Sequence, residues 1–348
     1  MTTGPTLIPE SKLNGFVVDV LAKAGVPAAD AAIVADCLLL ANLSGVDSHG
    51  IVRLAHYIRR LENGSIKTHP TLNFEQTAPS MGIMDGGDGL GHVVTHHATT
   101  KAMEMASESG TGVVSIRDSS HFGMAGFYIL RMIEEGYIGI AMTATDKMLV
   151  PFGAKKAFFG TNPLAIGFPT NGIPVMLDMA TTLTAWGKVA LARVEGKPIP
   201  ADWGIDGEGN PTTDPNAIAG LHPFGGSKGS GLAMIIDIFC SVLAGLPWGP
   251  HINLMYGEMD EPRKLGHFVM AIDVKRLLPL EFFKGHLGAM LEEFSALPPA
   301  EGFNRVYYPG QIEGLNRERR RKEGLPIDPG LYAELSELGQ RFGVAFPG

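Results

Sequence analysis

The segment IMDGGDGLGHVVTHHATTKAMEMASESGTGVVSIRD, residues 83–118, decides the fold. Its short apolar ends predict two β-strands, and the stretch from Gly91 between them predicts a helix. Similar apolar runs recur at 138–145, 165–170 and 174–180, separated by glycine-rich or polar turns. Strands that alternate with helices in this way predict an α/β core.

Three glycines in this segment imitate a dinucleotide-binding fingerprint. Gly87, Gly89 and Gly91 follow the first strand, and the acidic Asp118 ends the second one. Their spacing is GxGxG, whereas the fingerprint requires GxGxxG. A tight turn is therefore the preferred interpretation, and a Rossmann fold is rejected.

Two histidines on the predicted helix have a spacing that can bind a metal ion. His92 and His96 stand four residues apart, which places both imidazoles on one helical face. No glutamate follows as in the HExxH pattern, and no third ligand is found nearby. We therefore expect no metal here and interpret this face as a surface helix face.

Helical patterns surround the predicted core. Residues 11–25 and 27–43 carry apolar side chains at helical spacing, and the chain returns to helices near its C-terminus. No linker or repeat separates the parts, so the lobes are expected to be interwoven. The expected regions are a helical N-terminal region at 1–75, a mixed α/β core at 76–284, and C-terminal helices at 285–348 that pack with the first region.

Composition argues against several classes of function. The 348 residues carry 36 acidic and 28 basic side chains, a net charge of −8 that repels the phosphates of nucleic acids. No basic and apolar leader and no uncharged apolar run of about 18 residues occur, so neither export nor membrane insertion is expected. Cys37 and Cys240 lie in apolar stretches, which favours a cytoplasmic location. The basic run at 317–322 is interpreted as a solvated helix face or a subunit contact.

A first cluster of chemical groups surrounds His49. In Ser48-His49-Gly50, followed by Arg53 and Tyr57, positions 49, 53 and 57 share one face of a predicted helix. A guanidinium binds a carboxylate through a bidentate fork, and imidazole exchanges protons near neutral pH. This face suits a carboxylic-acid substrate. Alternatively, Ser48 only caps the helix, Arg53 forms a surface ion pair and His49 has no role.

A second candidate is His121, in the run Ser119-Ser120-His121-Phe122-Gly123. The run follows a predicted strand, and strand ends in α/β proteins deliver functional side chains. Imidazole has a pKa suited to moving a proton when an alcohol and a ketone are interconverted. A histidine satisfied by loop backbone is an equal alternative. A hydrolase that uses Ser119 or Ser120 is a third, although no GxSxG elbow is present.

A glycine-rich loop, GGSKGSG at 225–231, opens a helix predicted at 230–246. Free backbone N–H groups and the positive helix end can hold a pyrophosphate there, although close packing alone also explains the glycines. The spacing is not that of a Walker loop. Two polar strand tips, at 160–163 and 178–182, can bind a ribose or an amide, or cap a helix.

Seven motifs occur in the order of one known family: SHGIVRL, SSHFG, PFGAKKAFFGTNPLAIGFP, LDMATT with AWGKV, PTTDP, GGSKGSGL and YYPGQ. They span nearly the whole chain, which resembles the malate/L-lactate dehydrogenase type 2 family. The resemblance implies an oxidoreductase that moves a hydride at the alpha carbon of a small 2-hydroxy or 2-oxo acid, or of a related imine, with NAD or NADP. It also implies a homodimer and a mixed α/β fold distinct from the Rossmann fold.

The resemblance assigns roles to single residues. His121 is the expected proton acceptor, and His49 is a second acid/base candidate. The expected substrate-binding residues are Ser48, Arg53 as the carboxylate anchor, Tyr57, Thr161 and Asn162. Contacts to the cofactor, with NAD preferred over NADP, are expected from Thr145, Asp178, Met179, Ala180, Lys228, Gly229, Pro309, Gly310 and Gln311.

Within this family, MATTLTAWGKV, IPADWGIDGEGNPTTDP, GLPWG and GFNRVYYPGQ most resemble the members that oxidise ureidoglycolate to oxalurate with NAD. The bulky Phe122 and the VDSHG sequence at the substrate loop depart from that pattern. Malate, lactate, sulfolactate and cyclic imino acids therefore stay open as substrates. The alternative from another class is a non-catalytic module that binds a nucleotide or an anionic metabolite through its glycine loop.

Overall fold

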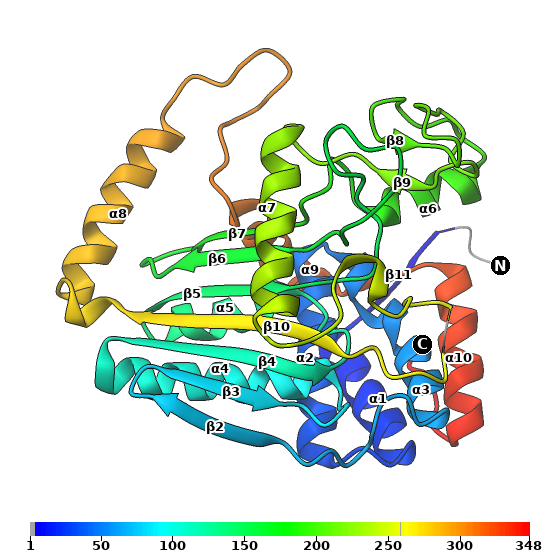
Figure 1. The fold of residues 1–348 in the computed structure, drawn as a ribbon, viewed down its shortest axis with the longest axis horizontal. Helices are drawn as coiled ribbons and strands as arrows, with labels where there is room; N and C mark the ends of the chain where they lie inside the picture. The colour runs from blue at the N-terminus through cyan, green and yellow to red at the C-terminus, as the bar shows by residue number, and fades with distance from the viewer. Residues whose placement is uncertain (1–3, 258) are drawn as a thin grey trace.

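A seven-stranded mixed β-sheet lies at the centre of the molecule (Figure 1). The computed structural model describes residues 4–257 and 259–348. The strands follow the spatial order β2-β3-β4-β10-β5-β6-β7. Their bounds are β2 Asn73–Ala78, β3 Met81–Asp85, β4 Thr111–Ser119, β5 Tyr137–Thr143, β6 Leu164–Phe168, β7 Val175–Met179 and β10 Leu265–Asp273.

The segment at 83–118 forms the βαβ unit that its pattern predicts. α4 (Gly91–Ser109) connects β3 to β4, which form the one parallel pair of the sheet among the residues described. Gly91 begins α4 so close to the next loop that an added Cβ would lie 2.2 Å from the carbonyl oxygen of Ser120. The glycine therefore serves close packing. The predicted mixed α/β fold, distinct from the Rossmann fold, is confirmed.

Helices cover both faces of this sheet. α4 and α5 (Ala125–Glu134) pack on one face, where Val269 and Ala271 of β10 are buried. α7 (Ser227–Asp237) and the π-helical turn η3 (Ile238–Val242) pack on the other face, against Phe268. A strand covered on both faces has no polar side, which explains the nearly continuous apolar run LGHFVMAID of β10.

The two ends of the chain share a second, helical core. Leu13 and Phe16 of α1 are buried together with Leu335 and Leu338 of α10, and α9 lies along α2. β1 pairs with β11 beside them. The bounds are β1 Thr6–Ile8, α1 Glu10–Lys23, α2 Ala28–Ser44, α3 Leu54–Glu62, α9 Gln311–Glu323, β11 Leu325–Ile327 and α10 Pro329–Phe342.

Two parts lie outside these cores (Figure 1). α6 (Trp186–Glu195), β8 (Gly204–Ile205) and β9 (Gly220–Leu221) surround a small apolar cluster of their own. α8 (Leu280–Ser295) extends from the opposite end of the sheet, and none of its side chains is buried. α9 and α10 thus contact the N-terminal helices and α8 does not. The division of the chain into regions that end at residues 75 and 284 stays a proposal.

The structure corrects two of the predicted helices. His49 and Arg53 belong to two 3₁₀ turns, η1 (Asp47–His49) and η2 (Ile51–Arg53), and α3 starts only at Leu54. Gly50 separates the turns in an extended conformation, and only glycine fits there because a Cβ would lie 2.2 Å from Oδ1 of Asn42. The helix predicted at 230–246 is observed as α7 followed by η3, so it begins at Ser227 and ends at Val242. Two further 3₁₀ turns are η4 (Gly249–His251) and η5 (Val274–Arg276).

In the ranges that the structure describes, no helix is both long enough and apolar enough to cross a membrane.

Candidate active site

Two imidazoles and a guanidinium meet where the helical core adjoins the end of β4. His49 of η1 stacks on His121, which follows β4, with ring centroids 5.7 Å apart and an interplanar angle of 24°. Arg53, at the end of η2, adds a positive charge close enough to lower the pKa values of both histidines. All three side chains are half-buried. The two candidate groups, which were predicted separately from distant motifs, therefore lie side by side.

His121 is held from its Nδ1 side. The phenol oxygen of Tyr57 lies 2.7 Å from Nδ1, and the backbone N–H of Gly123 lies 3.3 Å from the same atom. Tyr57 is fully buried, and burial raises the pKa of its phenol far above the usual value. Tyr57 thus positions the imidazole from behind, and its burial leaves no open surface for the predicted direct contact with substrate.

Both site histidines are neutral at pH 7. Burial, followed by the charge of Arg53, lowers the pKa of His49 to about 4. Burial, then His49 and Arg53, lowers the pKa of His121 well below its usual value. A neutral imidazole has a free nitrogen lone pair, so either ring can accept a proton.

Arg53 keeps part of its hydrogen-bonding capacity for a ligand. Its Nε donates to the carbonyl of Ser48 at 2.6 Å, and its Nη1 contacts the phenol oxygen of Tyr256. Ser48 also contacts Nδ1 of His49 through its hydroxyl at 3.0 Å. Ser48 thus orients both groups, and the remaining Nη donors of Arg53 can hold a carboxylate.

Sequence reasoning missed His267, a fully buried histidine of β10. Its Nδ1 lies 2.7 Å from the hydroxyl of Thr143, and its Nε2 lies 2.9 Å from the hydroxyl of Ser119. The ring thereby bridges β5 and β4. Burial lowers its pKa to about 3, which keeps the ring neutral. The apolar context of β10 gave no signal for this role.

The structure contradicts the hydrolase alternative. Ser119 and Ser120 are both buried. The first hydroxyl contacts His267, and the second donates to the carbonyl of Gly89 at 2.9 Å and accepts from the N–H of Gly91. Neither hydroxyl is free to act as a nucleophile with His121.

His92 and His96 differ in their surroundings. His92 is fully buried, and its two ring nitrogens have no hydrogen-bond partner among the described residues. It therefore does not lie on a surface helix face. The Nε2 atom of His96 lies 3.1 Å from the guanidinium of Arg131, and a cation at this position opposes metal binding.

The candidate cofactor residues at the ends of β5 and β7 are connected by hydrogen bonds. The N–H of Thr161 donates to the hydroxyl of Thr145 at 2.9 Å, and the N–H of Thr181 donates to the carbonyl of Thr161 at 2.8 Å. The N–H of Phe224 then donates to the carbonyl of Thr181 at 3.0 Å, which leads to the glycine loop. The predicted strand-tip residues thus lie together.

Asn162 is part of the scaffold. Its side chain is fully buried, accepts from the N–H of Thr145 at 3.0 Å and donates to Ala233 and Asp237 of α7 at 2.9 and 3.1 Å. Both amide hydrogens are used, the oxygen has one partner, and the side chain has no exposed surface for a ligand. The prediction that Asn162 contacts substrate does not fit this arrangement, because the amide already links β5 to α7.

The end of β7 and the start of α9 also adjoin. The N–H of Met176 donates to the carbonyl of Pro309 at 3.0 Å, and Gly310 adopts a φ of 86° against the same strand. Asp178 accepts from the N–H of Gly126 at 2.7 Å, while burial raises its pKa to about 6. Met179 and Ala180 follow at half-buried positions. Residues 178–180 and 309–311 therefore lie on neighbouring segments.

The glycine loop forms a tight turn into α7. Gly225 and Gly226 have φ values of 56° and 62°, and Lys228 is exposed. An added Cβ on Gly229 would lie 2.1 Å from the carbonyl oxygen of Phe224, whose carbonyl also accepts the N–H of Gly229. The free N–H groups predicted for this loop are thus partly used within the turn.

These residues fit a dinucleotide. Lys228 offers an exposed ammonium to a phosphate, and Gln311 has a buried Oε1 atom without a partner among the described residues. The hydroxyl groups of Thr145 and Thr161 lie 3.4 Å apart and add two more polar groups. The set therefore offers cationic, amide and hydroxyl groups to the phosphate, base and sugar parts of such a molecule.

The fold and the paired histidines beside Arg53 define the class: an oxidoreductase that acts on a small carboxylic acid. Residues 8–336 match the family profile described as malate/L-lactate dehydrogenase, and the chain belongs to this family. It is 38% identical to a malate dehydrogenase of Pyrococcus horikoshii over 97% of this chain and 96% of that one. It is 37% identical to an NAD(+)-dependent ureidoglycolate dehydrogenase of Escherichia coli (strain K12) over 94% of both chains.

Solved structures agree with this assignment. The crystal structure of a malate dehydrogenase from Entamoeba histolytica superimposes with a TM-score of 0.94 at 30% identity, covering 99% of this chain and 100% of that one. A sulfolactate dehydrogenase from Methanocaldococcus jannaschii gives a TM-score of 0.91 at 36% identity, with 98% of each chain covered. The resemblance inferred from the seven motifs is confirmed.

Proposed function

We propose that this protein transfers a hydride between a nicotinamide cofactor and the alpha carbon of a small 2-hydroxy acid, with Arg53 as carboxylate anchor and His121 as proton acceptor. One observation carries the proposal. The half-buried stack of His49 on His121 lies beside the partly free guanidinium of Arg53. The names of the relatives, which are dehydrogenases of malate, ureidoglycolate and sulfolactate, support the same chemistry.

The reaction follows from the groups around the alpha carbon. The guanidinium of Arg53 fixes the substrate carboxylate, which places the neighbouring hydroxyl at the histidine pair. When bound, the cofactor supplies a carbon that accepts the hydride. In the oxidation direction, Nδ1 of His121 carries the ring proton and donates it to the oxygen of Tyr57 in place of accepting the N–H of Gly123, and Nε2 accepts the substrate's hydroxyl proton. With the proton on Nε2, the same ring donates to a carbonyl oxygen in the reverse direction.

The charged side chains around the histidine pair favour the binding of an anionic substrate. Arg53, Arg60 and Arg263 contribute three guanidinium groups, and Asp146, which pairs with Arg263, contributes one carboxylate. Burial, followed by the positive charge of Arg263, lowers the pKa of Arg60 to about 10, so the group stays charged at pH 7. The excess positive charge supports an acidic substrate.

Ureidoglycolate, oxidised to oxalurate, is our first choice of substrate, based on the motifs MATTLTAWGKV and GFNRVYYPGQ and on the named relative. Malate is the second candidate, because a second carboxylate would complement the excess positive charge. NAD is the proposed cofactor, with NADP as the alternative; Thr145, residues 178–180, Lys228, Gly229 and residues 309–311 are proposed to hold it.

We also propose a homodimer in the cytoplasm. α7, η3 and the residue after η3 expose Met234, Ile235, Ile238, Phe239, Val242 and Leu243, and α8 exposes Phe282 and Met290. Apolar faces of this size favour a second copy of the chain as the covering partner. The two buried free thiols, Cys37 and Cys240, are compatible with a reducing compartment. Sedimentation that gives the mass of one chain would contradict the dimer.

Absorbance at 340 nm tests the proposed reaction. Purified protein is mixed with NAD or NADP and with ureidoglycolate, malate, lactate or sulfolactate, and in reverse with cyclic imino acids. We expect turnover with at least one acid, and a rate about 10²- to 10⁴-fold lower in His121→Ala with unchanged cofactor binding. A lack of turnover across the panel, with binding of nucleotide only, would favour the non-catalytic module.

A further inference from the structure

We infer that Tyr256 is a further substrate-binding residue, whose phenol donates a hydrogen bond to the carboxylate that Arg53 holds. The inference rests on the proposed function, because it requires Arg53 to bind that carboxylate. It concerns the loop 252–263, which lies between η4 and β10 and contacts Arg60 of α3; residue 258 lies outside the described residues.

The loop is held in place by two arginines that are almost completely buried. Arg60 of α3 donates to the carbonyls of Leu254 and Met255 at 3.1 and 2.9 Å, and to that of Glu261 at 3.2 Å. Its remaining donors contact His56 and Ser65. A buried guanidinium is costly unless its donors are satisfied, and here the loop backbone supplies most of the acceptors. The loop is thus a built part of the site.

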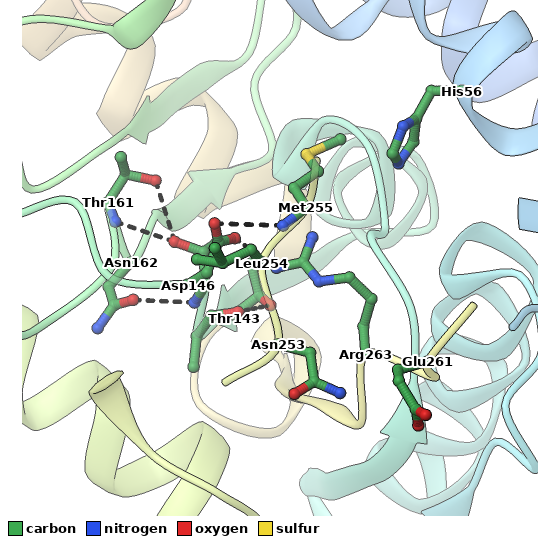
Figure 2. A network of polar contacts seen from close by, with 12 residues as sticks. His56, Thr143, Asp146, Thr161, Asn162, Asn253, Leu254, Met255, Glu261 and Arg263 are labelled. Atoms are coloured by element: carbon green, nitrogen blue, oxygen red, sulfur yellow. Dashed lines mark hydrogen bonds and ion pairs between the residues drawn. The ribbon is translucent and has the colours of Figure 1, made fainter. Parts of the chain in front are cut away.

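The second arginine connects the loop to the cofactor residues (Figure 2). Arg263 pairs with Asp146, and the other carboxylate oxygen of Asp146 accepts from the N–H of Met255 at 3.3 Å. Asp146 directly follows Thr145, whose hydroxyl accepts the N–H of Thr161. The carboxylate therefore fixes the loop at the point where the proposed cofactor and substrate sites meet.

This anchoring places Tyr256 against Arg53. The phenol oxygen contacts Nη1 of Arg53, and the guanidinium carbon lies 5.9 Å from the ring centroid. The ring of His56 packs edge-on against the same tyrosine, with centroids 5.2 Å apart. Tyr256 is nevertheless 62% exposed. An exposed aromatic ring fixed beside a half-buried cation is placed to contact a ligand that approaches from solvent.

The chemistry of the two groups explains the role. Nε of Arg53 is used by Ser48, so a carboxylate would bind its Nη groups. A carboxylate oxygen on Nη1 lies within reach of the phenol that contacts the same nitrogen. The phenol oxygen accepts from Arg53 in the absence of ligand, and its O–H donates to the carboxylate when the substrate is bound. Tyr256 would thus add a third donor to the two of the guanidinium fork.

The test compares Tyr256→Phe with wild type. We expect KM for the 2-hydroxy acid to rise about tenfold, because a hydrogen bond to a charged group is lost, with kcat almost unchanged. Tyr307→Phe is the matched control, since Tyr307 is also exposed and has an arginine, Arg305, over its ring at 5.0 Å. An unchanged KM in Tyr256→Phe, or an equal rise in the control, would overturn the inference.

Calorimetric binding of propionate, a carboxylate without a reacting hydroxyl, separates this inference from the proposed function. The dissociation constant should rise about tenfold in Tyr256→Phe and stay constant in Tyr307→Phe. Weaker binding in the Tyr256 variant supports the inference even if the protein shows no turnover. A lack of turnover would contradict only the proposed reaction. Equal affinity in wild type and Tyr256→Phe, or no binding to either, would contradict the role of Tyr256.

Discussion

The phenol oxygen of Tyr57 lies 2.7 Å from Nδ1 of His121, and the tyrosine has no exposed surface. This contact restrains the imidazole in the plane where Nε2 can meet a substrate oxygen. A tyrosine of the helical core thus orients a histidine at the end of a strand of the sheet. The site can form only when the two cores are packed together.

Removal of this contact should slow the chemical step. We expect Tyr57→Phe to lower kcat roughly five- to tenfold, because a neutral hydrogen bond contributes about 1 kcal/mol and the ring loses its restraint. Turnover at 340 nm under saturating substrate is the measurement. Tyr332→Phe, in the terminal helical core, is the control. A kcat equal to that of wild type would show that Tyr57 does not position His121.

Replacement of the guanidinium should weaken substrate binding. We expect Arg53→Lys to raise KM about tenfold or more, since an ammonium cannot reproduce the bidentate fork. Arg59→Lys is the matched control, because Arg59 follows on the same segment of chain with only a loose surface ion pair to Glu334. The same KM in Arg53→Lys and wild type would remove Arg53 from the site.

Buried neutral histidines should make the fold sensitive to acid. Burial lowers the folded-state pKa of His92 and of His267 to about 3, whereas an unfolded chain titrates near 6.5. The unfolded state therefore binds more protons below pH 6.5, and each histidine removes about 1.4 kcal/mol of stability per pH unit between 6.5 and its folded pKa. Above pH 6.5 the effect is absent.

Urea unfolding at pH 7.0 and at pH 5.5 measures this loss. His92→Phe should show a smaller decrease in the free energy of unfolding between the two pH values, because a group that must stay neutral has been removed. His69→Asn, at an exposed position, should keep the decrease of wild type. An identical decrease in His92→Phe would mean that His92 does not stay neutral in the folded protein.

Two glycines of the loop 225–231 offer a matched pair. A Cβ on Gly229 would lie 2.1 Å from the carbonyl of Phe224, while a Cβ on Gly231 would meet nothing within 4 Å. We expect Gly229→Ala to destabilise the fold by about 1–3 kcal/mol and to weaken cofactor binding several-fold. Gly231→Ala should stabilise α7 slightly. Fluorescence titration with NADH measures cofactor binding, and thermal unfolding measures stability. Identical behaviour of the two variants would contradict the role of Gly229.

The strands of the sheet could be predicted well from the sequence. The apolar runs at 138–145, 165–170 and 174–180 matched β5, β6 and β7, and the strand–helix–strand pattern at 83–118 matched β3, α4 and β4. Apolar periodicity records burial, and burial on both faces of a sheet leaves a clear pattern. The spatial order of the strands leaves no such pattern, because it depends on contacts between distant segments.

The site was predicted in part. His49 and His121 lie in polar motifs at element ends, and the structure brings them together. The prediction that residues 49, 53 and 57 share one helical face is wrong. Gly50, which packs closely against Asn42, separates two 3₁₀ turns there. Asn162 is committed to the scaffold for a similar reason, since its partners on α7 lie about seventy residues away. Tyr256 gave no signal, because an exposed tyrosine in a loop has no pattern of its own.

The position of β10 affects how the protein is made. Residues 265–273 pair with β4 on one side and with β5 on the other, so the middle strand of the sheet is encoded late in the chain. During synthesis, the strands at 111–119 and 137–143 leave the ribosome with a vacant place between them, each with an unpaired backbone edge. A nascent chain that stalls before residue 265 would therefore expose two unpaired strand edges that are prone to aggregation. Such fragments should be substrates for chaperones.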